Sequence, residues 1–587
     1  MKRTRTPLVI YLLLLSVFLT GIPSHALAQR ERRAEAQQQA PAPQPSPVPG
    51  SLPRPVASPT VLPSASPEPA VPAPKIAPAT TLPELQTKIS EILAKPELSS
   101  AMVGVKIVSL DTGRVLFEEN ANKLLRPASN MKLYTVAAAL DRLSPDYRFV
   151  TSVYATTPPD ASGVVRGNLT IYGRGDPSIA ARFNSGDYVK AIDDLASRIV
   201  AAGVKRVEGD LVGDETYFVG PKYGSGWTWE DLTWYYGAEV TPLTVNDNAL
   251  DLFIKPGAEV GQPAVITTGP PDPLLTIVNR VTTSPKGLRR ELSIHRGLAE
   301  NTITITCSIP VDDRGYSGGI GISHPALLFV YLLRASLARK GVVIAGKSRT
   351  TGEISQPSLI TAAPTQSVLP AVAGGSSGMN GSSAAPGPHQ NEIATFQSPP
   401  FSVIAAQTLK PSQNLYTELI LRTLGKMTLP PATMSSLNQT SENLGLEAVK
   451  TFLKTAGIRP EALVLDDGSG LSRSDMITAE ATVQLLTFMS KHRYATAFRD
   501  ALPIAGVDGT LRNRMRGTAA ENNVRAKTGS LSSAVSLGGY VTTAAGEKLA
   551  FTIMVNNYPR DVEPRSLCID PIAVLLASFS GKPEPKD

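Results

Sequence analysis

The chain has 587 residues, of which 42% are hydrophobic and 18% charged, with a formal net charge of +7 at pH 7. This composition supports ordinary globular cores and excludes a chain that is disordered or collagen-like throughout. The modest positive charge is compatible with many functions, and we infer no nucleic-acid partner from it. The two cysteines, Cys307 and Cys568, are too few for a disulfide scaffold, so we expect both to be free and buried.

Residues 1–28 have the layout of a secretory signal peptide. A basic start is followed by an apolar run at residues 8–20 and by a small-residue cleavage signal, Ala-Leu-Ala, that ends at Ala28. We therefore expect export to the periplasm or the cell-wall space. The alternative is an uncleaved membrane anchor, although the run is shorter than the ~20 residues that span a bilayer.

Residues 29–84 are predicted to be a proline-rich, disordered tether. Positions 41 to 83 hold 15 prolines but only three charged side chains. Such a segment cannot bury enough apolar surface to order itself, and it would hold the following domains away from whatever lies near the N-terminus.

Residues 85–148 are predicted to begin the first domain. Apolar residues at helical spacing indicate a helix at 85–93, and alternation with turn residues indicates a hairpin of strands at 102–110 and 115–117. A further amphipathic helix is expected to start at Ser129, directly after this hairpin.

Residues 149–358 are predicted to be a large insertion. Strands are expected at 168–173 and 207–213, with an amphipathic helix at 189–199 between them, which indicates one or two α+β domains. The next stretch, 359–399, has a Gly-, Ser-, Ala- and Pro-rich central part without charged side chains, so we expect a disordered surface loop.

Residues 400–582 are predicted to complete the first domain. Three strands are expected at 524–528, 535–541 and 548–555, followed by an apolar helix at 565–579. Helix and hairpin at one end of the chain, with strands and helix at the other, suggest one sheet assembled from both ends.

The sequence Ser-x-x-Lys occurs once, at Ser129 and Lys132. If Ser129 starts a helix, Lys132 lies one turn away on the same face, and the helix N-terminus favours negative charge on the serine oxygen. A lysine kept neutral by burial can then take the serine proton.

A second element, Lys-Thr-Gly, also occurs once, from Lys527 at the end of a predicted strand. Its lysine and the hydroxyl of Thr528 can bind a substrate carboxylate, and the glycine allows the substrate to approach the strand closely.

The third element, Ser-x-Asn, occurs three times, from Ser412, Ser436 and Ser441. The last two are expected in a polar loop, whereas the first precedes an apolar helical run. We therefore select Ser412 and Asn414.

Ser-x-x-Lys, Ser-x-Asn and Lys-Thr-Gly, in that order, are the signature set of penicillin-binding proteins and serine β-lactamases. With the long interval at 133–411 and further matches at 175–178, 242–248, 467–473 and 508–511, the chain resembles one group from about residue 85 to the C-terminus. This group is the class C low-molecular-mass penicillin-binding proteins, which are D-alanyl-D-alanine carboxypeptidases/endopeptidases.

The resemblance implies an α/β and α+β multidomain protein. Residues 85–148 and 400–582 would form a β-lactamase/transpeptidase-like domain, an antiparallel sheet with helices on both faces, which carries the large inserted α+β region. It also implies peptidoglycan stem peptides as substrates and β-lactams as inhibitors, with no cofactor and no metal.

The resemblance further implies four catalytic residues. Ser129 would attack the carbonyl between two D-alanines with Lys132 as general base, which gives an acyl-enzyme that water hydrolyses. Ser412 would help to pass a proton to the leaving amine, and Asn414 would hold the substrate amide.

Substrate binding is implied for five residues. Lys527 and Thr528 would bind the terminal carboxylate, and the backbone N–H of Ser530 would join that of the nucleophile in an oxyanion hole. Asp214 is expected to face the amino group of the diamino acid in the stem peptide, and Arg473 its carboxylate.

Other classes are less well supported. A catalytically poor wall-binding or penicillin-sensing protein would not need the complete motif set, and a β-lactamase would need a deacylating base that we cannot identify. Five scattered histidines give no zinc pattern, and Asp466 and Asp467 lie in a glycine-rich turn rather than as a glycosidase pair. The Trp- and Tyr-rich segment 227–236 is either a sugar-stacking surface or, as we expect, packed inside the inserted region.

Overall fold

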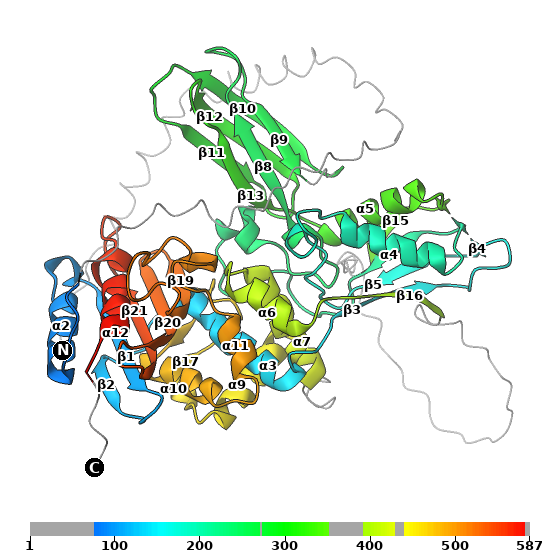
Figure 1. Ribbon diagram of the computed structural model, residues 1–587. Helices are drawn as coiled ribbons and strands as arrows, with labels where there is room; N and C mark the ends of the chain where they lie inside the picture. The colour runs from blue at the N-terminus through cyan, green and yellow to red at the C-terminus, as the bar shows by residue number, and fades with distance from the viewer. Residues whose placement is uncertain (1–75, 270–272, 352–390, 429–438, 582–587) are drawn as a thin grey trace, which may run out of the picture. The chain divides into compact units, whose positions relative to one another are not determined.

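The computed structural model describes residues 76–269, 273–351, 391–428 and 439–581 (Figure 1). The predicted signal peptide, nearly all of the tether and the central part of the low-complexity loop lie outside the described residues, as do Ser436 and Asn438. Within the described residues, no helix is both long and apolar enough to cross a membrane.

One antiparallel sheet is built from both ends of the chain, as the sequence predicts. Its strand order is β19-β20-β21-β1-β2, and β1 pairs with β21 along its full length. In Figure 1 the blue β1 therefore lies beside the orange-red β21. The strands are β1 (Met102–Ser109), β2 (Val115–Glu119), β19 (Arg525–Leu531), β20 (Ala534–Thr542) and β21 (Lys548–Asn556).

Helices cover both faces of this sheet because its central strand is apolar on both sides. Phe551 and Ile553 of β21 pack into the hydrophobic cluster that contains α2 (Leu82–Leu93) and α12 (Asp570–Ser578). Ala550 and Met554, which point the other way, pack into a second cluster with the remaining helices. Those helices are α3 (Met131–Leu143), α6 (Phe401–Leu409), α7 (Asn414–Thr428), α9 (Ser441–Thr455), α10 (Ala479–Ser490) and α11 (Ala495–Asp500).

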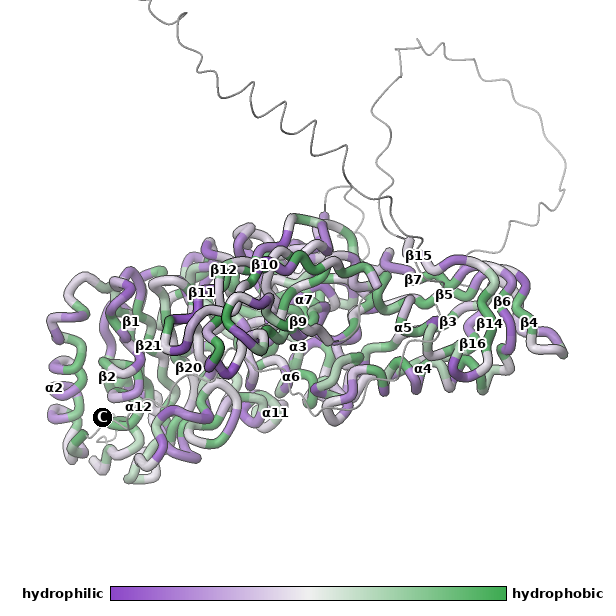
Figure 2. Tube along the Cα trace, turned by 90° about the horizontal axis from the view of Figure 1, so that it is seen from above, coloured by the Kyte–Doolittle hydropathy of each residue, from purple (hydrophilic) through white to green (hydrophobic). Residues whose placement is uncertain are grey.

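Helix α2 is amphipathic, and its turns alternate between hydrophilic and hydrophobic colouring in Figure 2. It begins at Leu82, with Thr81 as N-cap and a proline in the first turn, so the tether boundary predicted at residue 84 is three residues too late. The final helix is also as predicted, except that a π-helical turn, Arg565–Ile569, precedes α12.

The inserted region contains a mixed α+β part. Its five-stranded sheet has the order β15-β7-β5-β3-β16, and α4 (Lys190–Ala201) and α5 (Pro325–Arg339) share its hydrophobic cluster. A small sheet of order β14-β6-β4 belongs to the same part. The strands are β3 (Val150–Ala155), β4 (Val164–Val165), β5 (Leu169–Tyr172), β6 (Arg206–Val207), β7 (Leu211–Asp214), β14 (Val343–Ile344), β15 (Ser348–Thr351) and β16 (Asn391–Gln397).

A second part of the insertion is made of strands. Two three-stranded sheets, β13-β8-β9 and β10-β12-β11, share a hydrophobic cluster. These strands, which we did not predict individually, are β8 (Ala249–Lys255), β9 (Val265–Gly269), β10 (Thr276–Ser284), β11 (Glu291–Arg296), β12 (Thr302–Pro310) and β13 (Tyr316–Gly321).

The structure differs from three of the expectations. The range 359–399 was predicted to be loop, but strand β16 completes the sheet of the insertion by pairing with β3. Ser441 and Asn443 were expected in a polar loop, yet they lie in the first turn of α9, where Thr440 caps the helix. Both cysteines are free, but Cys307 is exposed on β12, whereas Cys568 is buried.

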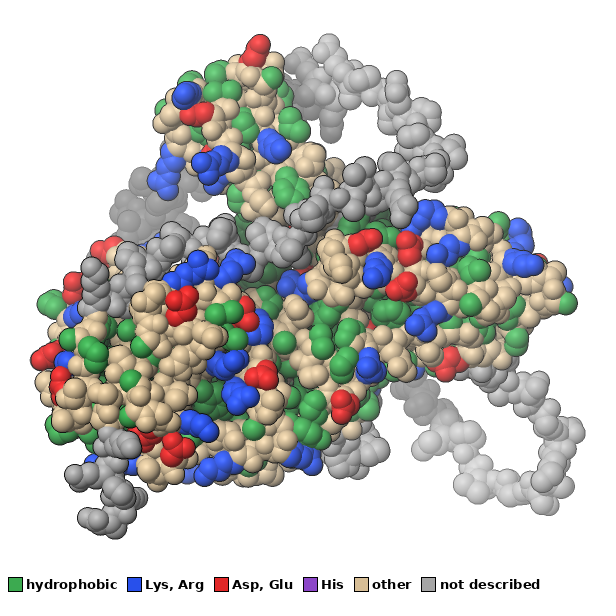
Figure 3. Space-filling view, in the orientation of Figure 1, with side chains coloured by type: hydrophobic (Ala, Val, Ile, Leu, Met, Phe, Trp, Pro, Cys, Tyr) green, Lys and Arg blue, Asp and Glu red, His purple; other side chains and the backbone are tan. Residues whose placement is uncertain are grey.

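Positive and negative side chains are interspersed on the face of the molecule shown in Figure 3. On that face, the positive net charge is therefore not gathered into a single patch.

Candidate active site

Ser129 lies in a 3-10 turn, Ala128–Asn130, that leads directly into α3. The preceding residue, Ala128, has a φ of +48°, a left-handed conformation that surrounding contacts must hold in place for a non-glycine residue. This turn presents the Ser129 hydroxyl at the start of the helix, one turn from Lys132.

Lys132 is fully buried, and its amine donates hydrogen bonds to oxygens from three parts of the chain. The acceptors are Ser129 Oγ at 2.9 Å, Asn414 Oδ1 at 2.6 Å and the carbonyl of Ser469 at 2.6 Å. Burial lowers the pKa of Lys132 to about 8, although nearby carboxyl groups oppose this effect. Roughly a tenth of the amine is therefore neutral at pH 7, far more than for an ordinary lysine.

The Ser-x-Asn element lies between α6 and α7. Ser412 has a φ of +65° in the connection, and Asn414 is the first residue of α7. The amine of Lys527 donates to Ser412 Oγ at 2.8 Å and to the carbonyl of Thr528 at 2.8 Å. Lys527 is also fully buried, and its pKa is held well below the usual range by burial first and by the charge of Lys132 second.

Strand β19 forms another side of the site. The hydroxyl of Thr528 is 2.8 Å from that of Thr510, and Ser530 is exposed and accepts a hydrogen bond from Arg565 at 2.8 Å. Gly529 has a packing role in addition to the close approach of substrate that we predict from the sequence. A Cβ at this position would lie 2.4 Å from the carbonyl of Pro127, so glycine allows β19 to pack against the segment that precedes the serine.

These elements surround a cavity of about 430 Å³. Of the residues selected from the sequence, those in its lining are Ser129, Ser412, Asn414, Arg473, Thr528 and Ser530, while Lys132 and Lys527 lie buried directly behind them. Four segments that are far apart in the sequence thus meet at one cavity.

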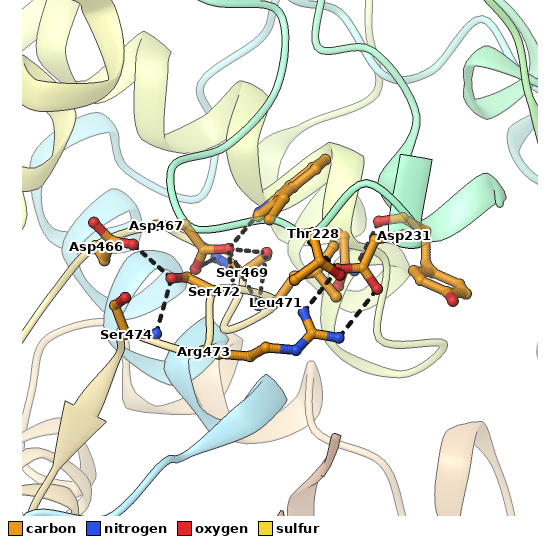
Figure 4. A network of polar contacts seen from close by, with 12 residues as sticks. Thr228, Asp231, Asp466, Asp467, Ser469, Leu471, Ser472, Arg473 and Ser474 are labelled. Atoms are coloured by element: carbon orange, nitrogen blue, oxygen red, sulfur yellow. Dashed lines mark hydrogen bonds and ion pairs between the residues drawn. The ribbon is translucent and has the colours of Figure 1, made fainter. Parts of the chain in front are cut away.

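The acidic residue beside Arg473 is Asp231, not Asp214 (Figure 4). Arg473 Nη1 and Asp231 Oδ2 are 2.7 Å apart, and both residues line the cavity. Asp214 instead lies at the end of β7 inside the insertion's sheet, where it is buried and accepts a hydrogen bond from the backbone of Thr216. A single sequence could not show which acidic residue of the insertion reaches the cavity.

The Trp- and Tyr-rich segment was also misjudged. Tyr235 and Tyr236 line the cavity, and Asn414 Nδ2 donates to the carbonyl of Tyr236 at 2.9 Å. The segment 227–236 therefore packs against the transpeptidase-like half of the chain rather than only inside the insertion. The aromatic residues of this segment were visible in the sequence, but we interpreted them as packing inside the insertion.

A serine at a helix start that lines a cavity, with one buried lysine a turn away and a second on a facing strand, defines an active-site-serine hydrolase of the penicillin-binding class. Comparison with known proteins agrees. The D-Ala-D-Ala carboxypeptidase 3 (S13) family matches residues 85–368 and 375–579.

The D-alanyl-D-alanine carboxypeptidase of Actinomadura sp. (strain R39) is 33% identical over 519 residues, which is 86% of each chain. The carboxypeptidase DacB of Haemophilus influenzae is 24% identical over 477 residues, 80% of this chain and 88% of its own. The crystal structure of penicillin-binding protein 4 from H. influenzae superposes with a TM-score of 0.66 at 22% identity, covering 84% of this chain and 99% of that one.

The chain therefore belongs to the D-Ala-D-Ala carboxypeptidase S13 family, the class C low-molecular-mass penicillin-binding proteins. It is a serine-type D-Ala-D-Ala carboxypeptidase, with peptidoglycan stem peptides as its class of substrate and β-lactams as its class of inhibitor.

The close packing at Gly529 gives a first prediction. The variant Gly529→Ala should push β19 away from the segment before Ser129 and lower the rate of acylation by penicillin about 10²-fold, as expected for a ~1 Å misplacement. The rate is measured by stopped-flow fluorescence with a reporter penicillin. Gly269→Ala is the matched control, because a Cβ there meets no atom within 4 Å; equal rates for both variants would contradict the prediction.

Proposed function

We propose that the enzyme is exported and hydrolyses the D-Ala-D-Ala ends and the cross-links of peptidoglycan through an acyl-enzyme on Ser129. The observation that carries the proposal is the contact of 2.9 Å between the fully buried Nζ of Lys132 and Oγ of Ser129, which lines the cavity. The signal-peptide pattern of residues 1–28 supports the export.

Acylation begins with transfer of the Ser129 proton to the neutral amine of Lys132. The serine oxygen then bonds to the carbonyl carbon between the two D-alanines, and the backbone N–H groups of Ser129 and Ser530 stabilise the oxyanion. As the C–N bond breaks, the leaving amine takes a proton through Ser412, whose hydroxyl contacts Lys527. Water hydrolyses the resulting ester and restores the serine.

Terminal carboxylate binding is assigned to Lys527 and Thr528. The lysine amine lies behind the cavity wall beside Ser412, and the threonine hydroxyl lies on the wall itself. Burial and Lys132 hold the pKa of Lys527 below its usual range, and an incoming carboxylate would favour the charged form of its amine. This favours substrates with a free terminal D-alanine or the carboxylate of a cross-link. Asn414, held between Lys132 and the carbonyl of Tyr236, is placed to hold the substrate amide.

The substrate side chain is assigned to the pair of Asp231 and Arg473. A diamino acid that ends in an amino group and a carboxylate can place its amine on the aspartate and its carboxylate on the guanidinium. Asp231 replaces Asp214 in this role because it lines the cavity.

Loss of the nucleophile is the direct test of the proposal. Ser129→Ala should lower the release of D-alanine from a stem pentapeptide by about 10³-fold or more, because no acyl-enzyme can form. Release is followed by an enzyme-coupled D-alanine assay. Ser197→Ala, in helix α4 of the insertion, is the control and should keep full activity. Wild-type release by the Ser129 variant would rule the proposal out.

A second test concerns the side chain. Arg473→Ala should reduce kcat/KM about 10-fold for a peptide whose diamino acid ends in an amine and a carboxylate, since a charge-assisted hydrogen bond is lost. A peptide with lysine at that position, which lacks the carboxylate, should be affected much less. Arg339→Ala, on α5, is the matched control. Equal losses on both peptides would show that Arg473 does not read the carboxylate.

A further inference from the structure

A tight turn at residues 466–474, whose polar contacts are drawn in Figure 4, touches both the catalytic lysine and the inserted region. Its contact with the lysine is the carbonyl of Ser469, which accepts a hydrogen bond of 2.6 Å from Lys132 Nζ. The direction of that N–H bond helps to fix where the amine sits relative to the Ser129 hydroxyl. The contacts that hold the Ser469 carbonyl in place therefore also affect the position of the Lys132 amine, the general base.

The turn is organised around the carboxylate of Asp467, which is fully buried. This one side chain accepts hydrogen bonds from four successive backbone N–H groups and from the Ser469 hydroxyl at 2.8 Å. The backbone donors, with distances of 3.0, 2.6, 3.1 and 3.0 Å, belong to Ser469, Gly470, Leu471 and Ser472. A carboxylate with this many donors leaves the backbone of the turn little freedom, including the peptide that carries the Ser469 carbonyl.

The inserted region also contacts the carboxylate of Asp467. Trp227 Nε1 donates to Asp467 Oδ2 at 2.8 Å, across 240 residues of sequence. Two neighbouring contacts join the same segments: Ser225 Oγ donates to Asp466 Oδ1 at 2.9 Å, and Arg473 pairs with Asp231. The indole contact is the one that reaches the carboxylate behind Lys132.

We propose that Asp467 and Trp227 are positioning residues for Lys132. Asp467 fixes the Ser469 carbonyl on the lysine amine, and the indole N–H of Trp227 fixes Asp467. The inserted region thereby acts on the general base without touching the reacting atoms. This inference rests on the proposed role of Lys132 as base.

The charges around the lysine make the inference measurable. Lys132 faces Asp467, Glu418 on α7, Asp475 just beyond the turn and Lys527 on β19. The three carboxyl groups raise the pKa of Lys132 against the dominant effect of burial, and Asp467 contributes most. Burial raises the pKa of Glu418 and of Asp475 well above the usual range, which weakens the negative charge that they present.

Acylation should therefore rise with pH as Lys132 loses its proton, with a midpoint near its pKa of about 8. Asp467→Asn removes a negative charge but keeps the shape of the side chain. The rising limb of the curve of acylation rate against pH should therefore move to lower pH. Trp227→Phe removes a donor from the carboxylate and leaves its charge less compensated, so the limb should move to higher pH. In both variants the rate on the plateau should fall about 10-fold, because the amine is held less firmly.

The experiment measures the rate constant of acylation by a fluorescent penicillin from pH 6 to 10 on the full chain. Trp229→Phe is the matched control, since this indole is 62% exposed and lies outside the cavity lining; its limb should coincide with that of the wild type. Melting temperatures are recorded for every variant.

Limbs that shift in opposite directions for Asp467→Asn and Trp227→Phe would support the inference. Limbs that both coincide with the wild type, with a loss of rate equal at every pH, would overturn it, because a merely structural defect lowers the active fraction without moving the midpoint. If the wild type itself were not acylated on Ser129, the proposed function would fail instead, so the two failures are distinguishable.

Discussion

The burial of two lysine amines beside two serine hydroxyls is the constraint on which this site depends. Lys132 and Lys527 are both fully buried, and an ammonium group taken out of water costs several kcal/mol unless hydrogen-bond acceptors replace the water. Lys132 finds its acceptors in the 3-10 turn before α3, on α7 and in the turn at 466–474. The same burial brings its pKa down to about 8, so the feature that is costly for folding is the one that the chemistry uses.

The architecture follows from the need to bring these acceptors together. The sheet joins the two ends of the chain through β1 and β21, which places β19 next to the turn that carries Ser129. Gly529 allows the strand to approach that turn closely, and α7 contributes Asn414 from the other side. The insertion adds Tyr236, Asp231 and Trp227, so it forms part of the cavity wall and contacts the turn behind the lysine.

The sequence predicted the parts of the site that are defined by short spacing. Ser129 and Lys132 lie one helical turn apart, and Lys527 lies on a strand, so local patterns were enough to select them. The choice of Ser412 over Ser441 also relied on a local feature, the apolar helix that follows, even though the second serine proved to begin a helix of its own.

The other features of the site and of the fold depend on contacts between residues far apart in the chain, which no local pattern encodes. Local sequence patterns do not distinguish Asp214 from Asp231. Only the three-dimensional path of the insertion brings Asp231 to Arg473. Strand β16 was hidden because its pairing partner, β3, is more than 230 residues away. Cys307 was expected to be buried, but it lies on a strand of the second part of the insertion whose burial depends on how two small sheets pack.

The central claim, that the buried lysine activates Ser129 for acyl transfer, is tested most directly by trapping the acyl-enzyme. Purified protein lacking residues 1–28 is mixed with a fluorescent penicillin, digested, and the labelled peptide is mapped by mass spectrometry. We expect a single stable adduct on Ser129. An adduct on another serine, or intact penicillin recovered with no adduct at all, would contradict it.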